Sequence, residues 1–153
     1  TSGEMIAMMG TSGSGKTTCL RILADKRKAI SGSVLKGEVN VNGQPISKSD
    51  QSKSVFIPQN DALLATATVQ EMMEFSASLR LPAVMPREDK LKKVNKLIDR
   101  LGLGHVRGTF VGSDDEIIRG LSGGERRRLS IGVELITDPK LIFADEPTSG
   151  LDA

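Results

Sequence analysis

The chain has 153 residues, long enough for one domain with a buried core, and its 21 basic and 19 acidic side chains leave a formal charge of only +2. This excess of positive charge is too small to imply a polyanionic partner such as a nucleic acid. A single cysteine, Cys19, excludes an internal disulfide, and no apolar run reaches the roughly 20 residues that a membrane-crossing helix needs.

The first predicted element is a buried strand over residues 5–9, and a helix beginning near Lys16 and reaching Ala24 follows it. Cys19 lies in that helix, where we expect a packed and inert thiol. The loop between them fits the pattern G-x-x-x-x-G-K-[ST] and comprises Gly10, Thr11, Ser12, Gly13, Ser14, Gly15, Lys16, Thr17 and Thr18. Glycines let backbone N–H groups turn toward an anion, and the start of the helix adds its positive dipole.

Such a pattern also arises by chance in glycine-rich linkers, but the strand before it and the helix behind it favour a phosphate-binding loop. Lys16 is then expected to reach the β/γ-phosphates of a nucleotide, and the Thr17 hydroxyl to bind Mg²⁺. Further on, residues 37–43 alternate apolar and polar and end in Asn-Gly, which predicts a half-exposed antiparallel strand with a turn. Residues 54–58 predict a second strand, stopped by Pro58 and followed by Gln59.

Two helices are predicted next, over residues 69–81 with Thr68 as the cap and over residues 88–101. The methionines of the first helix are expected to lie in the core rather than to bind a cofactor, and the lysines of the second to form a solvated face. His105 follows the second helix and has no neighbouring Cys or His, so we expect a surface residue rather than a metal ligand.

Residues 121–125, Leu-Ser-Gly-Gly-Glu, open another predicted helix that runs to about Thr137. Ser122 and Glu125 have the spacing of a capping box, while glycines at a helix start also leave N–H groups open to an anion, and both interpretations stand. The triplet Arg126-Arg127-Arg128 has no aromatic neighbours, so a solvated face is favoured over nucleic-acid binding.

Residues 140–144 predict a buried strand that ends in Asp145-Glu146. An acidic pair in a turn would carry no function by itself. Beside a phosphate-binding loop, however, the first carboxylate is suited to holding Mg²⁺ and the second to polarising an attacking water.

Together, the loop at residues 10–17, Gln59, LSGGE at 121–125 and LIFADE at 141–146 followed by SGLD resemble an ATP-binding cassette (ABC) nucleotide-binding domain over nearly the whole chain. LSGGE is the discriminating motif. More narrowly, the stretches QND at 59–61, FSASLRLP at 75–82, GERRRLSIG at 124–132 and DEPTSGLD at 145–152 resemble the eukaryotic G subfamily, the White-type half-transporters.

This resemblance implies roles for individual residues. Glu146 would be the general base and Gln59 would contact Mg²⁺, the attacking water and, by relay, the membrane part. Asp145 would bind Mg²⁺ with Thr17, and residues 10–18 would hold the phosphates of ATP, with Lys16 counted as catalytic. The signature residues Ser122, Gly123 and Gly124 would close over the ATP of a second nucleotide-binding domain, so that two cassettes form a head-to-tail dimer.

The implied fold is α/β: a P-loop NTPase with a mainly parallel core sheet, a small antiparallel β portion and a helical subdomain. We expect residues 1–60 to carry the phosphate loop and β portion, 61–136 the helical subdomain, and 137–153 the last strand and the D-loop. The implied function is ATP-driven transport of lipids, sterols or amphiphiles, at the cytoplasmic face of a membrane, through transmembrane segments missing from this stretch.

Two family features lie outside the chain: residues 1–9 contain no aromatic to stack on adenine, and the switch histidine would come after Ala153. We therefore expect the chain to be a piece of a longer protein that alone binds Mg-ATP weakly and hydrolyses little. The rivals are a soluble translation-type ABC ATPase, a chromosome-type ATPase, disfavoured because no long heptad insert is present, and a regulatory cassette without turnover, disfavoured because Lys16 and Glu146 are both present.

Overall fold

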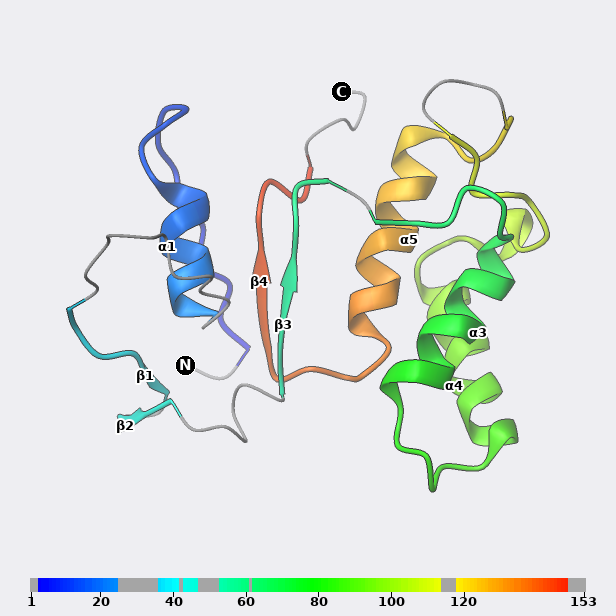
Figure 1. Ribbon diagram of the computed structural model, residues 1–153, viewed down its shortest axis with the longest axis horizontal. Coiled ribbons are helices and arrows are strands. Elements are labelled where there is room, and N and C mark those ends of the chain that lie inside the picture. Colours follow the sequence, from blue (N-terminus) through cyan, green and yellow to red (C-terminus); the bar gives the residue numbers. More distant parts are fainter. Residues whose placement is uncertain are drawn as a thin grey trace.

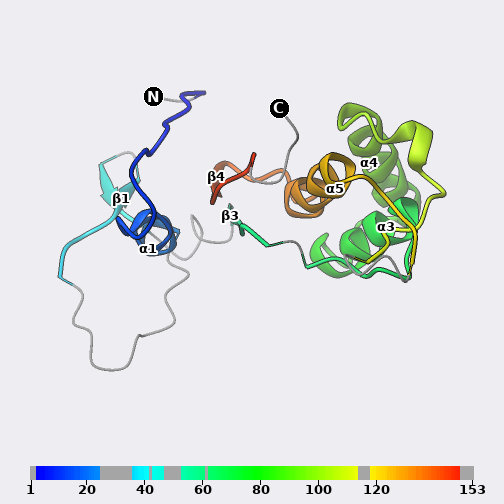
Figure 2. The same ribbon diagram turned by 90° about the horizontal axis from the view of Figure 1, so that it is seen from above.

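The computed structural model describes residues 3–24, 36–41, 43–46, 53–60, 62–113 and 118–148. Its helices are α1 (Lys16–Leu23), α3 (Val69–Arg80), α4 (Arg87–Arg100), the short 3₁₀ helix η1 (Gly104–Val106) and α5 (Gly123–Leu135), and its strands are β1 (Asn40–Val41), β2 (Gln44–Pro45), β3 (Ser54–Ile57) and β4 (Leu141–Ala144). Figures 1 and 2 show β3 and β4 between α1 on one side and α5 on the other, with α3 and α4 beyond α5.

The strands form one parallel and one antiparallel pair. β3 and β4 run parallel, with Ser54 opposite Leu141 and Ile57 opposite Ala144, so both strands end at the same edge. β1 and β2 pair antiparallel around Gly43, whose φ of 78° is the left-handed conformation that suits a tight turn. The predicted parallel and antiparallel portions are thus both present, although β1 is shorter than the predicted strand over residues 37–43.

Two apolar runs are more exposed than we expected. Residues 4–10 form no strand, and Met5 and Met9 are 94% and 90% exposed, so the predicted buried strand over residues 5–9 is wrong. An apolar run becomes a buried strand only where a neighbour pairs with its backbone, and the described strands pair β1 with β2 and β3 with β4. β4 forms as predicted, but Ile142 remains half exposed because, in the described part of the chain, β4 has a strand neighbour along one edge only.

Helix α1 begins at Lys16, as predicted, and lies next to β3, where the guanidinium of Arg21 sits 6.0 Å from the centre of the Phe56 ring. Cys19, on this helix, is exposed, so the expected packed thiol is wrong. The reason is that α1 has no fully buried residue and contributes little of its surface to a core.

The main hydrophobic core lies among α3, α4 and α5. Val69, Met73, Val94, Ile98 and Leu129 are all fully buried there, which confirms that the methionine stripe belongs to the core. Both predicted helices are correct to within one residue at each end. The cap at Thr68 is also confirmed, since its hydroxyl accepts from the amide of Glu71 and the Glu71 carboxylate accepts from the amide of Thr68.

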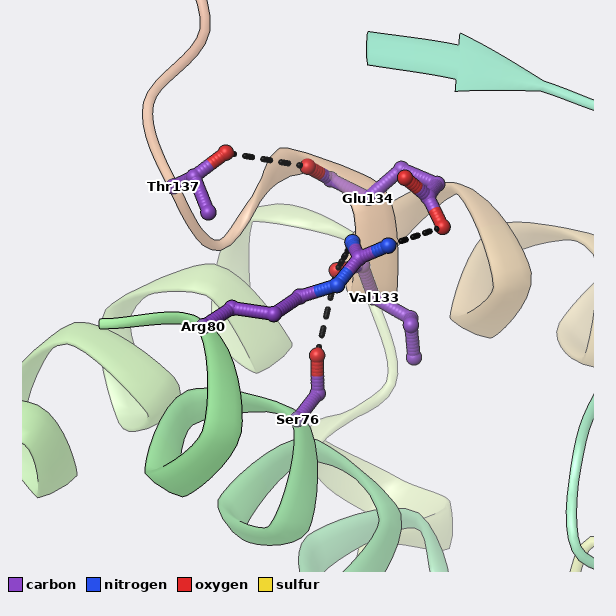
Figure 3. Close-up of polar contacts among 5 residues, drawn as sticks. All are labelled: Ser76, Arg80, Val133, Glu134 and Thr137. Atoms are coloured by element: carbon purple, nitrogen blue, oxygen red, sulfur yellow. Dashed lines mark hydrogen bonds and ion pairs between the residues drawn. The ribbon is translucent and has the colours of Figure 1, made fainter. Parts of the chain in front are cut away.

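Polar contacts fix the C-terminal turn of α5 to α3 (Figure 3). Arg80 of α3 donates to the Val133 carbonyl at 2.8 Å and pairs with the Glu134 carboxylate at 2.7 Å, and the Ser76 hydroxyl donates to the same Val133 carbonyl at 3.2 Å. The last carbonyls of a helix lack partners within the helix and carry a partial negative charge, so a cation is favourable there. Among the described residues, no helix is long and apolar enough to cross a membrane.

Candidate functional site

The glycine-rich loop that precedes α1 is closed by its own lysine. The Lys16 ammonium donates to the carbonyl oxygens of Gly10 at 2.9 Å and Thr11 at 3.0 Å. Gly15 caps the helix at a φ of 88°, and a Cβ at Gly10 would lie 2.7 Å from the Ser14 hydroxyl oxygen, so larger residues at either position would disturb the turn. Ser12, Gly13, Ser14 and Thr18 are exposed around it.

Thr17 connects this loop to the end of β4. Its hydroxyl donates to the Oδ1 of Asp145 at 3.0 Å, and Asp145 is 3% exposed. Hydroxyl and carboxylate oxygens are the ligands that Mg²⁺ prefers, and this ion is usually held by one or two protein oxygens together with substrate phosphates. The pair therefore fits the ion, and among the described residues no larger group of His, Cys, Asp and Glu could hold a metal alone.

Gln59 and Glu146 meet at the ends of β3 and β4. The Gln59 side-chain amide donates to the Glu146 carboxylate at 2.8 Å. The backbone of Glu146 has a φ of 45°, in the left-handed region that costs a residue with a side chain about 1–2 kcal/mol. Strained backbone of this kind persists only where surrounding contacts hold it, and it gathers at functional sites.

Arg127 supplies such contacts, and we missed it in the sequence. We expected the arginine triplet to be a solvated face, but Arg127 is 3% exposed, while Arg128, next to it, is exposed. Its guanidinium donates to the backbone carbonyls of five residues from two strand ends: Pro58, Gln59, Asp145, Glu146 and Pro147. The only available signal was position, because Arg127 is three residues before the buried Ser130, on a helix whose core-facing side repeats every three to four residues.

Ser122, Gly123 and Gly124 lie at the start of α5, and the capping box is formed. The Ser122 hydroxyl accepts from the amide of Glu125, whose carboxylate accepts from the amide of Ser122 at 2.9 Å. The Ser122 amide, then its hydroxyl, and a 3.1 Å contact with His105 hold the pKa of Glu125 below its usual value of 4.5. In Figures 1 and 2 the strand pair separates α5 from the loop before α1, so this motif lies away from Lys16 of its own chain.

The structure thus brings the predicted residues together in two places. Lys16, Thr17, Gln59, Asp145 and Glu146 are connected across one edge of the strand pair, whereas the Ser122 motif stands apart. A groove of about 570 Å³ between α3 and α4, lined by Phe75, Arg87 and Leu91 among others, contains none of the predicted site residues. At the edge that holds the candidate site, Gln59 and Glu146 are exposed and Asp145 is buried.

Comparison with known proteins shows which family this chain is similar to. Residues 1–149 match the family model described as ABC transporter. The chain is 46% identical over 152 residues to ABC transporter G family member 6 of Arabidopsis thaliana, and 46% identical over 156 residues to ABC transporter G family member 1 of Dictyostelium discoideum; each alignment covers 99% of this chain. The chain spans about a fifth of the length of these curated relatives, 20% and 19%.

Proposed function

Because this chain belongs to the ABC transporter family, we propose that it binds Mg-ATP at the loop of residues 10–18 and hydrolyses it with Glu146 as the general base. The observation that carries the proposal is the connection of five residues at one edge: Lys16 on the loop, Thr17 bonded to Asp145, and Gln59 bonded to Glu146. A phosphate-binding lysine, two oxygen ligands for a metal and a carboxylate that accepts a proton are the parts that phosphoryl transfer to water requires.

Each residue then has a distinct task. Lys16 balances the negative charge of the β/γ-phosphates, and Thr17 with Asp145 would hold Mg²⁺, which when bound neutralises charge on the phosphate oxygens. Gln59 orients the Glu146 carboxylate through the side-chain N–H that it donates. Glu146 accepts the proton of that water.

We further propose that two cassettes act as a head-to-tail pair. Ser122, Gly123 and Gly124 present backbone N–H groups at a helix start, a favourable place for a phosphate. Their distance in space from Lys16 of the same chain favours a second cassette as the source of that phosphate. ATP would then join the two cassettes, and hydrolysis would separate them.

The whole protein would use this cycle to move lipids, sterols or other amphiphiles across a membrane, from its cytoplasmic face, through transmembrane segments elsewhere in the polypeptide. Residues 1–60, 61–136 and 137–153 would be its phosphate-loop, helical and final-strand parts. The relatives named above are called transporters, and no observation favours a soluble ABC ATPase.

The test is made on the full-length polypeptide reconstituted in lipid vesicles. ATP-dependent movement of a fluorescent phospholipid or sterol is measured for the wild type and for Lys16→Met, which keeps the length of the side chain but removes its charge. We expect movement in the wild type that stops in the variant. ATP turnover without movement of any lipid or sterol would refute the substrate class, and movement by Lys16→Met at the wild-type rate would refute the role of the loop.

A further inference from the structure

We propose that Arg127 is a positioning residue for hydrolysis, which holds the peptide segments of Gln59 and Glu146 in register with each other and with helix α5. This inference rests on the proposed function, because it assigns Arg127 a role through Gln59 and Glu146. The Arg127 guanidinium donates to backbone carbonyls of both segments, so we expect its effect to reach Gln59 and Glu146 through the backbone.

Each of the three guanidinium nitrogens of Arg127 donates to backbone carbonyls at the two strand ends. Nε donates to Pro147 at 3.1 Å, Nη1 to Pro58 at 2.8 Å and Gln59 at 3.2 Å, and Nη2 to Asp145 and Glu146 at 3.3 Å each. An arginine has five N–H donors in a fixed planar fork, whereas a lysine has three donors at a single point. Only the fork reaches carbonyls on both strand ends at once.

These carbonyls belong to the residues whose geometry matters most. Three of them are consecutive, from Asp145 to Pro147, and span the left-handed φ of 45° at Glu146. The other two belong to Pro58 and Gln59, which directly follow the end of β3, and the Gln59 side chain donates to Glu146. Arg127 therefore supports both partners of the Gln59–Glu146 hydrogen bond, and removing it frees the strained turn to relax.

Helix α5 is also fixed to other parts of the chain. Its first turn carries the Ser122–Glu125 capping box, and its last turn is bonded to Arg80 and Ser76 of α3 (Figure 3). A movement of α5 or of the helices packed on it would reach Glu146 through Arg127. In a dimer in which Ser122 to Gly124 contact the second cassette, the same arginine would link docking of that cassette to the geometry of the general base.

The experiment uses the full-length polypeptide with Arg127→Gln, which removes the charge and most donors, and Arg127→Lys, which keeps the charge but not the fork. Matched controls are Arg128→Gln and Arg128→Lys, one residue along the same helix on its exposed side. ATP turnover is measured per mole of bound nucleotide, so that a smaller folded fraction does not count as a slower enzyme. The dissociation constant for Mg-ATP is measured beside it.

We expect turnover per bound nucleotide to fall about 10-fold or more in Arg127→Gln and by less in Arg127→Lys, with nucleotide affinity within about threefold of wild type and both Arg128 variants near wild type. If Arg127→Gln does not fold, Arg127→Lys decides. Turnover per bound nucleotide equal to wild type in the folded Arg127 variants, with only a lower yield or melting temperature, would overturn the proposal.

A double-variant cycle tests the route. In the Glu146→Gln background we expect Arg127→Gln to cause little further loss, because the group that it positions is already removed. A further loss as large as in the wild type would contradict action through Glu146.

Hydrogen exchange separates this inference from the proposed function. If the wild type proves to have no ATP turnover, the proposed function fails, but the arginine can still be judged. We expect faster amide exchange at Gln59 and Asn60 and at Asp145, Glu146 and Thr148 in Arg127→Gln than in Arg128→Gln, and equal exchange in the two variants would refute the inference.

Discussion

The side-chain amide of Gln59 donates to the carboxylate of Glu146 over 2.8 Å, although 87 residues separate the two in sequence. The parallel pairing of β3 with β4 creates this contact, because Ile57 and Ala144 are opposite each other and both strands end there. Gln59 and Glu146 follow two residues after those ends. The relationship makes Gln59 a partner of the proposed general base and not only a candidate metal contact.

Gln59→Leu keeps the approximate volume of the side chain but removes its donor. We expect ATP turnover to fall about 10-fold, equivalent to about 1.4 kcal/mol in the activation free energy, because the Glu146 carboxylate loses the group that orients it. Nucleotide affinity should change by less than about threefold, as measured by equilibrium binding. Asn60→Leu, on the next residue, serves as the control and should leave turnover near wild type; an equal loss in both variants would argue against a specific Gln59–Glu146 contact.

Thr17→Ala should change the dependence on Mg²⁺. The Thr17 hydroxyl bonds Asp145 at 3.0 Å, and without it the metal loses one proposed ligand and Asp145 loses a donor. We expect the Mg²⁺ concentration for half-maximal ATP turnover to rise about 10-fold or more, whereas Thr17→Ser, which keeps the hydroxyl, should remain within about threefold. A Thr17→Ala variant with the wild-type Mg²⁺ dependence would remove Thr17 from the metal site.

Gly132 marks where α5 approaches α3 and the end of α4. A Cβ added there would lie 2.5 Å from Leu101 Cδ1 and 3.4 Å from Met73 Sδ. Alanine gains up to about 1 kcal/mol of helix propensity while Leu101 moves aside, so Gly132→Ala should change the free energy of unfolding by less than about 1 kcal/mol. Gly132→Val overpacks the same contact and should cost about 1–3 kcal/mol in urea unfolding experiments. Equal stability of the two variants would show that this contact is not tight.

The capping box of α5 should make stability depend on pH. The Glu125 pKa is held below 4.5 in the folded chain, mainly by the Ser122 amide, so the ionised carboxylate stabilises the folded state. That stabilisation is complete above the unfolded pKa and is lost as the pH falls through the folded pKa. Glu125→Gln cannot ionise, so the free energy of unfolding, measured with urea between about pH 3 and pH 6, should fall less steeply with acid than in the wild type. Parallel slopes would contradict the assignment.

Much of the fold was predictable because the signals were local. Caps at Thr68 and Ser122, the turn at Gly43 and the periodicity of α3 and α4 depend on residues a few positions apart, and the structure confirms them. The ABC transporter resemblance, including its G subfamily, is confirmed by the family match and by relatives at about 45% identity.

The errors concern contacts between distant segments. The apolar run at residues 5–9 predicted a buried strand, but burial requires a neighbouring strand, which periodicity cannot supply. The predicted burial of Cys19 and Ile142 was wrong for the same reason, because the sequence does not say which face of a helix or strand another element covers. The burial of Arg127 was not predicted, because a charged side chain is expected to be exposed unless it has buried partners. Its partners are backbone carbonyls 18 to 69 residues away, which the sequence does not reveal.

We propose Glu146 as the base of an ATP-hydrolysing site. The most direct measurement compares steady-state Mg-ATP turnover of the full-length polypeptide with that of Glu146→Gln, together with nucleotide binding by each. We expect turnover in the wild type and a loss of about 10²-fold or more in the variant, because a carboxamide cannot accept the proton of the attacking water. Nucleotide binding should be retained in the variant. Turnover within twofold of wild type in Glu146→Gln would contradict the proposal.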